Sequence, residues 1–306
     1  MIEQFSESAK FASVDIGSNA VRFMVKTATH QPNGIINSSV LMYTRVPIRL
    51  GEDVFIKGKV SDYKTKQLIQ VMKAVRHLLK VCCVQNFRAC ATSALREAKN
   101  SKKIVEEVVE KTKINIEVIS GREEARLLYA NRQIENKKSL QMYVDVGGGS
   151  TEISLIKDGQ VIESRSFKVG TVRMLLNATE NGVMENLRKE VVDLNVRYND
   201  IHLVGSGGNI EKFYSLSDQK DKVKKTLPIA SLRALYDDLK SLSVDERIEK
   251  YNFKRDRADV IVPAGEIFLT IADGIGASEI NVPMYGLADG IVADLIKNYW
   301  GINNNS

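Results

Sequence analysis

Two carboxylates flank a run of three glycines near the middle of the sequence. The segment Met142 to Ile156 reads MYVDVGGGSTEISLI, with Asp145 before the glycines and Glu152 after them. Residues without a Cβ atom let backbone N–H groups approach an anion closely and tolerate positive φ angles. Carboxylate oxygens are ligands that Mg²⁺ prefers, together with waters and substrate phosphates. The pattern indicates a Mg²⁺-phosphate site, and a tight glycine hairpin without a ligand is the alternative.

The residues around the glycines predict a hairpin. Met142 to Val146 has the apolar composition of a strand, and after the turn Ile153, Leu155 and Val161 continue an extended pattern and not a helical one. The turn between the two strands would cradle phosphates. The residues assigned to this cradle are Gly147, Gly148, Gly149, Ser150 and Thr151.

A second Asp-x-Gly hairpin is predicted near the N-terminus. Phe11 to Lys26 reads FASVDIGSNAVRFMVK, in which an apolar strand ends at Asp15 and the turn contains Ser18 and Asn19. Two such hairpins, each opening about half of the chain, imply a duplicated domain. Their loops would face each other across a cleft and hold a phosphate chain from both sides. Chance similarity of two strand-turn-strand units is the alternative.

Two predicted helix starts carry further charged groups. Phe87 to Ala91 is predicted as a short buried strand that leads into a hydroxyl-rich helix start and Arg96. Free N–H groups at a helix start favour anions, and arginine adds a planar donor that is always charged. A surface arginine paired with a carboxylate is the alternative interpretation.

The second helix is predicted from Ser120 to about Ile134. Ser120 and Glu123 have the spacing of a capping box, which gives Glu123 a structural role. Glu124 has no such role. A carboxylate there could act as a general base, or it could simply be a favourable charge in the first turn of a helix.

The rest of the chain is read more coarsely. Ser61 to Val81 has one apolar face and is predicted to be a helix, whereas Thr44 to Lys59 is read as strand and loop. A strand from His202 leads into a third glycine loop that contains Gly207 and Gly208. This loop precedes a helix and again offers N–H groups to an anion.

Composition narrows the class of protein. A chain of 306 residues suggests two domains. With 43% hydrophobic and 27% charged residues it is globular, and no apolar run approaches the ~18 residues of a membrane span. The N-terminal sequence lacks the pattern of a secretion signal, so we expect a cytoplasmic protein. The net charge of +6 permits a polyanionic ligand.

Several common motifs are excluded. The chain contains no Gly-x-x-x-x-Gly-Lys-Ser/Thr and no Gly-x-Ser-x-Gly, which removes the P-loop enzymes and the usual serine hydrolases. A dinucleotide fold needs its glycine fingerprint to lead from strand to helix, whereas the Gly147 turn leads into a strand.

Six segments occur in an order that resembles the exopolyphosphatase and guanosine pentaphosphate phosphohydrolase (Ppx/GppA phosphatase) family of the actin and sugar-kinase superfamily. They are VDIGSNAVRFMV, ATSALREAKN, VISGREEARLLY, YVDVGGGSTEISL, VGTVRML and LVGSGGNIEKF, and the resemblance covers about residues 11 to 298. It implies an α/β protein with two ribonuclease-H-like (actin-like ATPase) domains and a cleft between them. The first domain would comprise residues 1–124 and about 286–306, and the second residues 125–285.

The resemblance also implies a reaction. It is removal of the terminal phosphate from inorganic polyphosphate or guanosine pentaphosphate, by in-line attack of a water that Glu124 activates as general base. Asp145 and Glu152 would hold Mg²⁺ or another divalent cation, with Asp15 supporting the metal or the first loop, and Arg96 would clamp phosphoryl oxygens. The phosphate-binding set implied in this way is Ser18, Asn19, Arg22, Gly147, Gly148, Gly149, Ser150, Thr151, Gly207 and Gly208.

Two rival functions stay open at this point. One is an ATP-dependent small-molecule kinase of the same superfamily, and the other is a non-catalytic nucleotide or polyphosphate sensor. The partner in the preferred reading is polyphosphate or guanosine pentaphosphate as substrate. Neither a membrane nor a nucleic acid is expected, and a homodimer is allowed.

Overall fold

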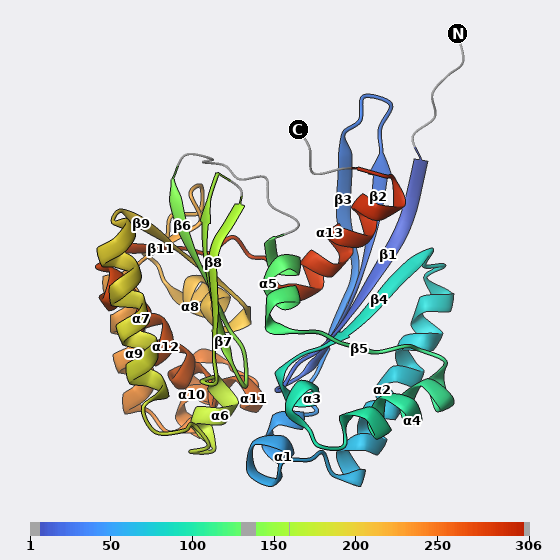
Figure 1. The fold of residues 1–306 in the computed structure, drawn as a ribbon, viewed down its shortest axis with the longest axis horizontal. Helices are drawn as coiled ribbons and strands as arrows, with labels where there is room; N and C mark the ends of the chain where they lie inside the picture. Colours follow the sequence, from blue (N-terminus) through green and yellow to red (C-terminus); the bar gives the residue numbers. More distant parts are fainter. Residues whose placement is uncertain (1–6, 130–138, 159, 303–306) are drawn as a thin grey trace. The chain divides into compact units, whose positions relative to one another are not determined.

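The protein, seen here in a computed structural model that describes residues 7–129, 139–158 and 160–302, is divided into two compact units (Figure 1). The first comprises Met1–Arg132 and Leu287–Ser306, and the second Gln133–Gly286. Each unit has its own sheet and its own hydrophobic core. The boundary expected after residue 124 falls inside a helix, α5 (Gly121–Tyr129), whose residues all belong to the first unit.

The first unit is built on a five-stranded sheet. Its strands are β1 (Glu7–Ile16), β2 (Val21–His30), β3 (Ile36–Val46), β4 (Asn86–Ala91) and β5 (Glu117–Val118). The spatial order is β3-β2-β1-β4-β5, in which β1, β2 and β3 form an antiparallel meander and β4 and β5 continue in parallel. Because side chains alternate along a strand, Val14 and Ile16 of β1 face one helical layer while Phe11 and Asp15 point to the other side.

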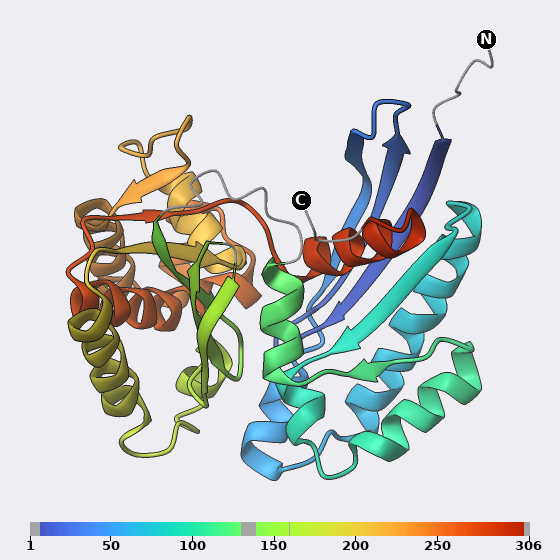
Figure 2. The ribbon, with the colours of Figure 1, turned by 45° about the horizontal axis from the view of Figure 1, so that its top comes forward.

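Helices cover both faces of this sheet (Figures 1 and 2). They are α1 (Leu50–Lys57), α2 (Asp62–Val81), α3 (Ser93–Glu97), α4 (Ser101–Thr112), α5 and α13 (Leu287–Tyr299). The predicted helix α2 is confirmed: Ser61 caps it by accepting a hydrogen bond from the Lys64 N–H, and its apolar face is buried. Strand and loop were expected at Thr44 to Lys59. The strand β3 does extend to Val46, but helix α1 replaces the expected loop, so the loop prediction was wrong.

The second unit repeats this topology. Its strands are β6 (Leu140–Val146), β7 (Thr151–Lys157), β8 (Gln160–Phe167), β9 (Ile201–Ser206), β10 (Thr226–Pro228) and β11 (Glu279–Asn281). The order is β10-β11-β9-β6-β7-β8: β6, β7 and β8 form an antiparallel meander, and β9 and β11 continue in parallel. Strand β10 adds an edge. The two predicted Asp-x-Gly hairpins and the α/β fold with two ribonuclease-H-like domains are confirmed.

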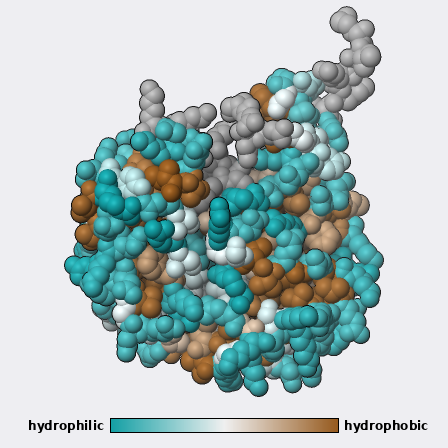
Figure 3. Space-filling model, viewed as in Figure 1, coloured by the Kyte–Doolittle hydropathy of each residue, from teal (hydrophilic) through white to brown (hydrophobic). Residues whose placement is uncertain are grey.

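The helices of the second unit surround a buried central one. They are α6 (Thr171–Leu175), α7 (Val183–Tyr198), α8 (Gly208–Leu216), α9 (Ile229–Ser241), α10 (Val244–Tyr251), α11 (Arg255–Ala258) and α12 (Ile261–Ile275). Helix α12 packs against both α7 and α9 and buries Ile267, Phe268 and Ile271. The face shown in Figure 3 is mainly hydrophilic. Among the described residues, no helix combines the length and the apolar character needed to cross a membrane.

In the first unit, α5 and α13 approach each other at a glycine. A Cβ atom added to Gly290 of α13 would lie 2.0 Å from the backbone oxygen of Leu127 in α5. Leu127 and Leu128 pack there against Ile291 and Leu295 of α13. The backbone of α5 therefore rests directly on α13, and no side chain at position 290 separates the two helices.

We expect Gly290→Ala to destabilise the protein. Alanine is favoured over glycine in a helix by about 1 kcal/mol. Overpacking costs typically ~1–3 kcal/mol, and here the obstacle is backbone that no side-chain rotation can relieve. A lower free energy of unfolding in a urea titration would report the steric term, with Gly286→Ala as the control, because a Cβ at Gly286 meets no atom within 4 Å. An increase for Gly290→Ala would contradict the close helix contact.

Candidate functional site

The carbonyl groups of the glycine turn in the second unit accept hydrogen bonds that hold the turn in place. The Gly147 N–H donates to the Ser150 oxygen at 2.9 Å, and the first N–H groups of α6 donate to the carbonyls of Gly147 and Gly148 at 2.9–3.0 Å. Arg173 Nε donates to the Gly149 oxygen at 2.9 Å. In the part of the chain that the structure describes, no group accepts a hydrogen bond from the N–H of Gly148 or Gly149. Both remain for an anion, as a phosphate cradle requires.

Asp145 and Glu152 face each other across the hairpin. They are direct partners in the antiparallel register of β6 and β7, and Glu152 is 2% exposed. Glu152 Oε1 accepts hydrogen bonds from Ser150 Oγ at 2.6 Å and Ser166 Oγ at 3.1 Å. Asp145 Oδ1 accepts one from Ser206 Oγ at 3.1 Å. Like charges at directly opposite positions are destabilising, and a bound cation would offset their repulsion.

The third glycine loop lies beside Asp145. Gly207 has a φ of 95°, and a Cβ there would lie 3.0 Å from Asp145 Oδ1. At Gly208 a Cβ would lie 2.9 Å from the guanidinium of Arg257, which also donates to Asn209 Oδ1 at 2.6 Å. The positive φ explains the glycine at position 207, and the close approach of Arg257 explains the glycine at position 208. Their contact with phosphate stays a prediction.

The equivalent hairpin of the first unit carries an ion pair. Asp15 is opposite Arg22 in the register of β1 and β2, and Arg22 Nη1 donates to Asp15 Oδ2 at 2.7 Å. Arg22 therefore occupies the position that Glu152 occupies in the second unit. The ion pair with Arg22 agrees with support of the first loop, one of the two roles predicted for Asp15, and its role toward a metal stays a prediction.

The first turn is held in the same way as the second. The Gly17 N–H donates to the Ala20 oxygen at 3.0 Å, and the N–H groups of Arg49 and Gly51, at the start of α1, donate to the carbonyls of Asn19 and Ser18. The start of helix α1 thus donates hydrogen bonds to the carbonyls of this turn, as the start of α6 does for the glycine turn of the second unit. The hydroxyl of Ser18 lies 2.7 Å from that of Ser93, which connects the turn to α3 as well.

Arg96 and Glu124 form one ion pair. Arg96 Nη1 donates to Glu124 Oε2 at 3.1 Å and to the Ile119 oxygen at 2.9 Å, and Glu124 is 7% exposed. Arg96 lies on α3, the helix that contacts the first turn through Ser93. The structure therefore brings the predicted clamp and the predicted base together within the first unit and connects both to the turn of its Asp-x-Gly hairpin.

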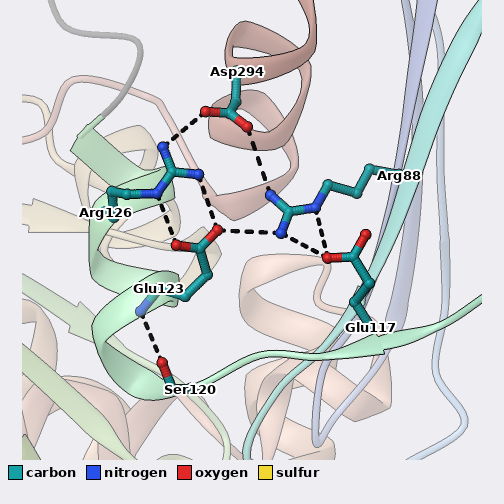
Figure 4. A network of polar contacts seen from close by, with 6 residues as sticks. All are labelled: Arg88, Glu117, Ser120, Glu123, Arg126 and Asp294. Atoms are coloured by element: carbon teal, nitrogen blue, oxygen red, sulfur yellow. Dashed lines mark hydrogen bonds and ion pairs between the residues drawn. The ribbon is translucent and has the colours of Figure 1, made fainter. Parts of the chain in front are cut away.

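Glu123 has a structural role, but not quite the predicted one. Its N–H donates to Ser120 Oγ at 3.2 Å, which is one half of the capping box. Its carboxylate accepts hydrogen bonds from Arg126 at 2.7 and 2.9 Å and from Arg88 at 3.2 Å (Figure 4). These bonds, the one from Arg126 most of all, lower the pKa of Glu123 below its ordinary value of 4.5. The predicted end of this helix at Ile134 lies outside the described residues.

The lowered pKa of Glu123 predicts a pH dependence of stability. A carboxyl whose pKa is lower in the folded state contributes stability above its unfolded pKa and loses it as the pH falls through the folded pKa. The free energy of unfolding should therefore fall more steeply below about pH 4.5 in the wild type than in Glu123→Gln. Glu106→Gln, at an exposed position of α4, is the control. If the free energy of unfolding depends on pH in the same way in the wild type and in Glu123→Gln, the Glu123 carboxylate does not contribute to this pH dependence.

Some supporting residues were not predicted. Ser206 and Ser166 bind the two carboxylates from β9 and β8, and Ser93 meets the first turn from α3. The register of the sheet would have found the first two, since Ser206 is paired with Asp145 and Ser166 with Glu152. For Ser206 this register joins strands far apart in the sequence, since Ser206 and Asp145 are 61 residues apart, whereas β7 and β8 are consecutive strands.

The model of the Ppx/GppA phosphatase family matches residues 28–299 of the chain. The chain belongs to this family. It is 22% identical to exopolyphosphatase 1 of Mycobacterium tuberculosis over 299 residues, which cover 91% of this chain and 86% of the relative. It is 24% identical over 261 residues to guanosine-5'-triphosphate,3'-diphosphate pyrophosphatase of Aliivibrio fischeri, covering 78% of this chain and 50% of the relative.

A solved structure agrees with this assignment. The Ppx/GppA family member of Aquifex aeolicus is 27% identical, with a TM-score of 0.77 and coverage of 98% of this chain and 100% of that one. The predicted family and fold are confirmed. As a Ppx/GppA phosphatase, the protein is a hydrolase that acts on phosphoanhydride bonds.

Proposed function

We propose that the protein removes the terminal phosphate from inorganic polyphosphate or from guanosine pentaphosphate. The relatives named for these two substrates support both as candidates. The observation that carries the proposal is the glycine turn of the second unit, where two N–H groups remain for an anion beside a pair of opposed carboxylates. Such a turn suits the end of a phosphate chain and its counter-ion.

The residues of the second unit fit a divalent cation. Asp145 and Glu152 supply carboxylate oxygens from neighbouring strands, and hydroxyl groups orient both of them. At the equivalent place in the first unit, Asp15 pairs with Arg22. Asp145 and Glu152 would hold Mg²⁺, and Asp15 would support the first loop. A cation bound there would neutralise charge on the phosphoryl oxygens.

Glu124 is proposed as the general base of the same reaction. Its buried carboxylate accepts a hydrogen bond from Arg96 and can accept another from a water, which it would orient toward the terminal phosphorus. As that water attacks, its proton passes to Glu124 and the bond to the bridging oxygen breaks. Hydrolysis of this kind depends mainly on positioning and on stabilising charge.

The cations of the first unit would stabilise the transferring group. Arg96 would clamp its oxygens, and Arg22 would be a second cation. Each of the two turns would bind phosphate groups of the substrate. The residues proposed for this contact are Ser18, Asn19, Gly147, Gly148, Gly149, Ser150 and Thr151, with Gly207 and Gly208 as a weaker extension.

One assay tests the proposed function. Phosphate release from polyphosphate and from guanosine pentaphosphate is measured side by side, with Mg²⁺ and with a chelator. We expect Mg²⁺-dependent release from at least one of them. Binding of both without release would favour a sensor, and ATP consumption that requires an acceptor would favour a kinase. Either result would overturn the proposal.

A further inference from the structure

A network of charged side chains joins four elements of the first unit (Figure 4). Arg88 of β4 lies 2.7 Å from Glu117 of β5 and 3.2 Å from Glu123 of α5. Arg126 of α5 donates to Glu123 and, at 2.8 Å, to Asp294 of α13. Asp294 lies 3.6 Å from Arg88 through its other oxygen, which closes the ring. We call these five residues the α5 network.

The α5 network is partly shielded from solvent. The side chains of Arg88 and Asp294 are 18% and 16% exposed, whereas those of Arg126 and Glu117 are 51% and 43% exposed. Arg126 and Arg88 have raised pKa values, chiefly because each donates hydrogen bonds to carboxylates. Isolated surface pairs contribute little to stability, whereas arginine forks that bridge several carboxylates fix geometry. The network is therefore suited to orient helix α5.

Helix α5 depends on such contacts. Its described part has nine residues, and a helix segment of this length is marginal without tertiary packing. It is attached to α13 at two places, where Leu127 rests on Gly290 and where Arg126 binds Asp294. Positions 290 and 294 are one turn apart on α13. Two attachments one turn apart fix both the position of α5 along α13 and its rotation about its own axis.

This rotation sets the direction of Glu124. Neighbouring residues of a helix point about 100° apart, so holding Glu123 in the network directs Glu124 toward Arg96. Side-chain ends lie roughly 5–6 Å from a helix axis, and a rotation of about 20° would move a carboxylate by ~2 Å. A misplacement of about 1 Å can cost an enzyme roughly 10²-fold in rate.

We propose that Asp294 is a positioning residue for Glu124. Through Arg126 and Arg88 it holds Glu123, and so it sets the orientation of the neighbouring carboxylate without contact with substrate. The last described helix of the chain thereby takes part in the chemistry of the first unit. The inference rests on the proposed function of Glu124 as general base.

The first test compares Asp294→Asn with Asp245→Asn. Asp245 is an exposed aspartate of the second unit that pairs with Arg255, so the chemical change is the same. For Asp294→Asn we expect kcat to fall about 10-fold or more with KM within about 2-fold, since binding groups are untouched. Asp245→Asn should keep the wild-type kcat. An unchanged kcat for Asp294→Asn would overturn the inference.

The second test is a double-mutant cycle with Glu124→Gln. If Asp294 acts through the Glu124 carboxylate, Asp294→Asn should cause little further loss once that carboxylate is gone. A general loss of folded protein would lower the rate by the same factor in both backgrounds and would overturn the positioning role. Absence of phosphate release by the wild type would instead overturn the proposed function, so the two failures are distinguishable.

A variant with conserved charge covers the case in which Asp294→Asn does not fold. Arg126→Lys keeps the positive charge, but lysine lacks the planar fork that bridges Glu123 and Asp294. We expect the same loss of kcat at unchanged KM and the same non-additivity with Glu124→Gln. Full activity of folded Arg126→Lys would contradict the proposal, and so would a loss that is additive with Glu124→Gln.

Discussion

Glu124→Gln is expected to lower turnover by roughly 10²-fold or more, the contribution of a general base, with folding intact. The substitution keeps the size of the side chain and an oxygen that can accept the hydrogen bond from Arg96. It removes the group that would take the proton from the attacking water. Arg96 also donates to the Ile119 oxygen, so the guanidinium keeps one of its attachments. The measurement is kcat for phosphate release at saturating Mg²⁺ and substrate.

The control for this prediction is a glutamate far from the proposed chemistry. Glu106→Gln, on the exposed face of α4, should have wild-type kcat. Thermal unfolding of both variants shows whether a lower rate reflects less folded protein. Wild-type turnover in folded Glu124→Gln would remove Glu124 as the base. A raised KM at constant kcat would assign it to substrate binding instead.

The two hairpins could be predicted from sequence because their signals are local. Alternation on both sides of Asp15 and Asp145, with glycines between, fixes a strand, a turn and a strand in either half of the chain. Because the Asp-x-Gly hairpin pattern occurs twice, the sequence also predicted that the two halves of the chain share a topology. The amphipathic helix α2 and its serine cap were local signals of the same kind.

Other features were missed because their causes are tertiary. Helix α1 follows Arg49, which is in the left-handed conformation and gives no side-chain cap, and it has a glycine at its second position. It forms where its first N–H groups meet the carbonyls of Ser18 and Asn19, a contact that the local sequence does not encode. Glu123 is similar, since its arginine partner Arg88 lies on a strand 35 residues away.

The second large effect is expected for Asp145→Asn, which should lose activation at the Mg²⁺ concentrations that saturate the wild type. Loss of one of the two opposed carboxylates should raise the half-saturating Mg²⁺ concentration by at least about 10-fold, since even partners outside the ligand set change metal affinity by 10–100-fold. Asp15→Asn makes the same change at the equivalent position of the first unit. Because Asp15 pairs with Arg22, that variant should keep the wild-type Mg²⁺ dependence.

Stability provides a measure of the same site that is independent of activity. Opposed carboxylates destabilise a strand pair, so without metal Asp145→Asn should unfold at a higher temperature than the wild type, by the equivalent of about 0.2–1 kcal/mol. Mg²⁺ should raise the unfolding temperature of the wild type by mass action and leave that of Asp145→Asn unchanged. Equal stabilisation of both proteins by Mg²⁺ would remove Asp145 as a ligand. If the variant is more stable and no longer responds to metal, Asp145 is a ligand of the cation, and the bound cation offsets the repulsion between Asp145 and Glu152.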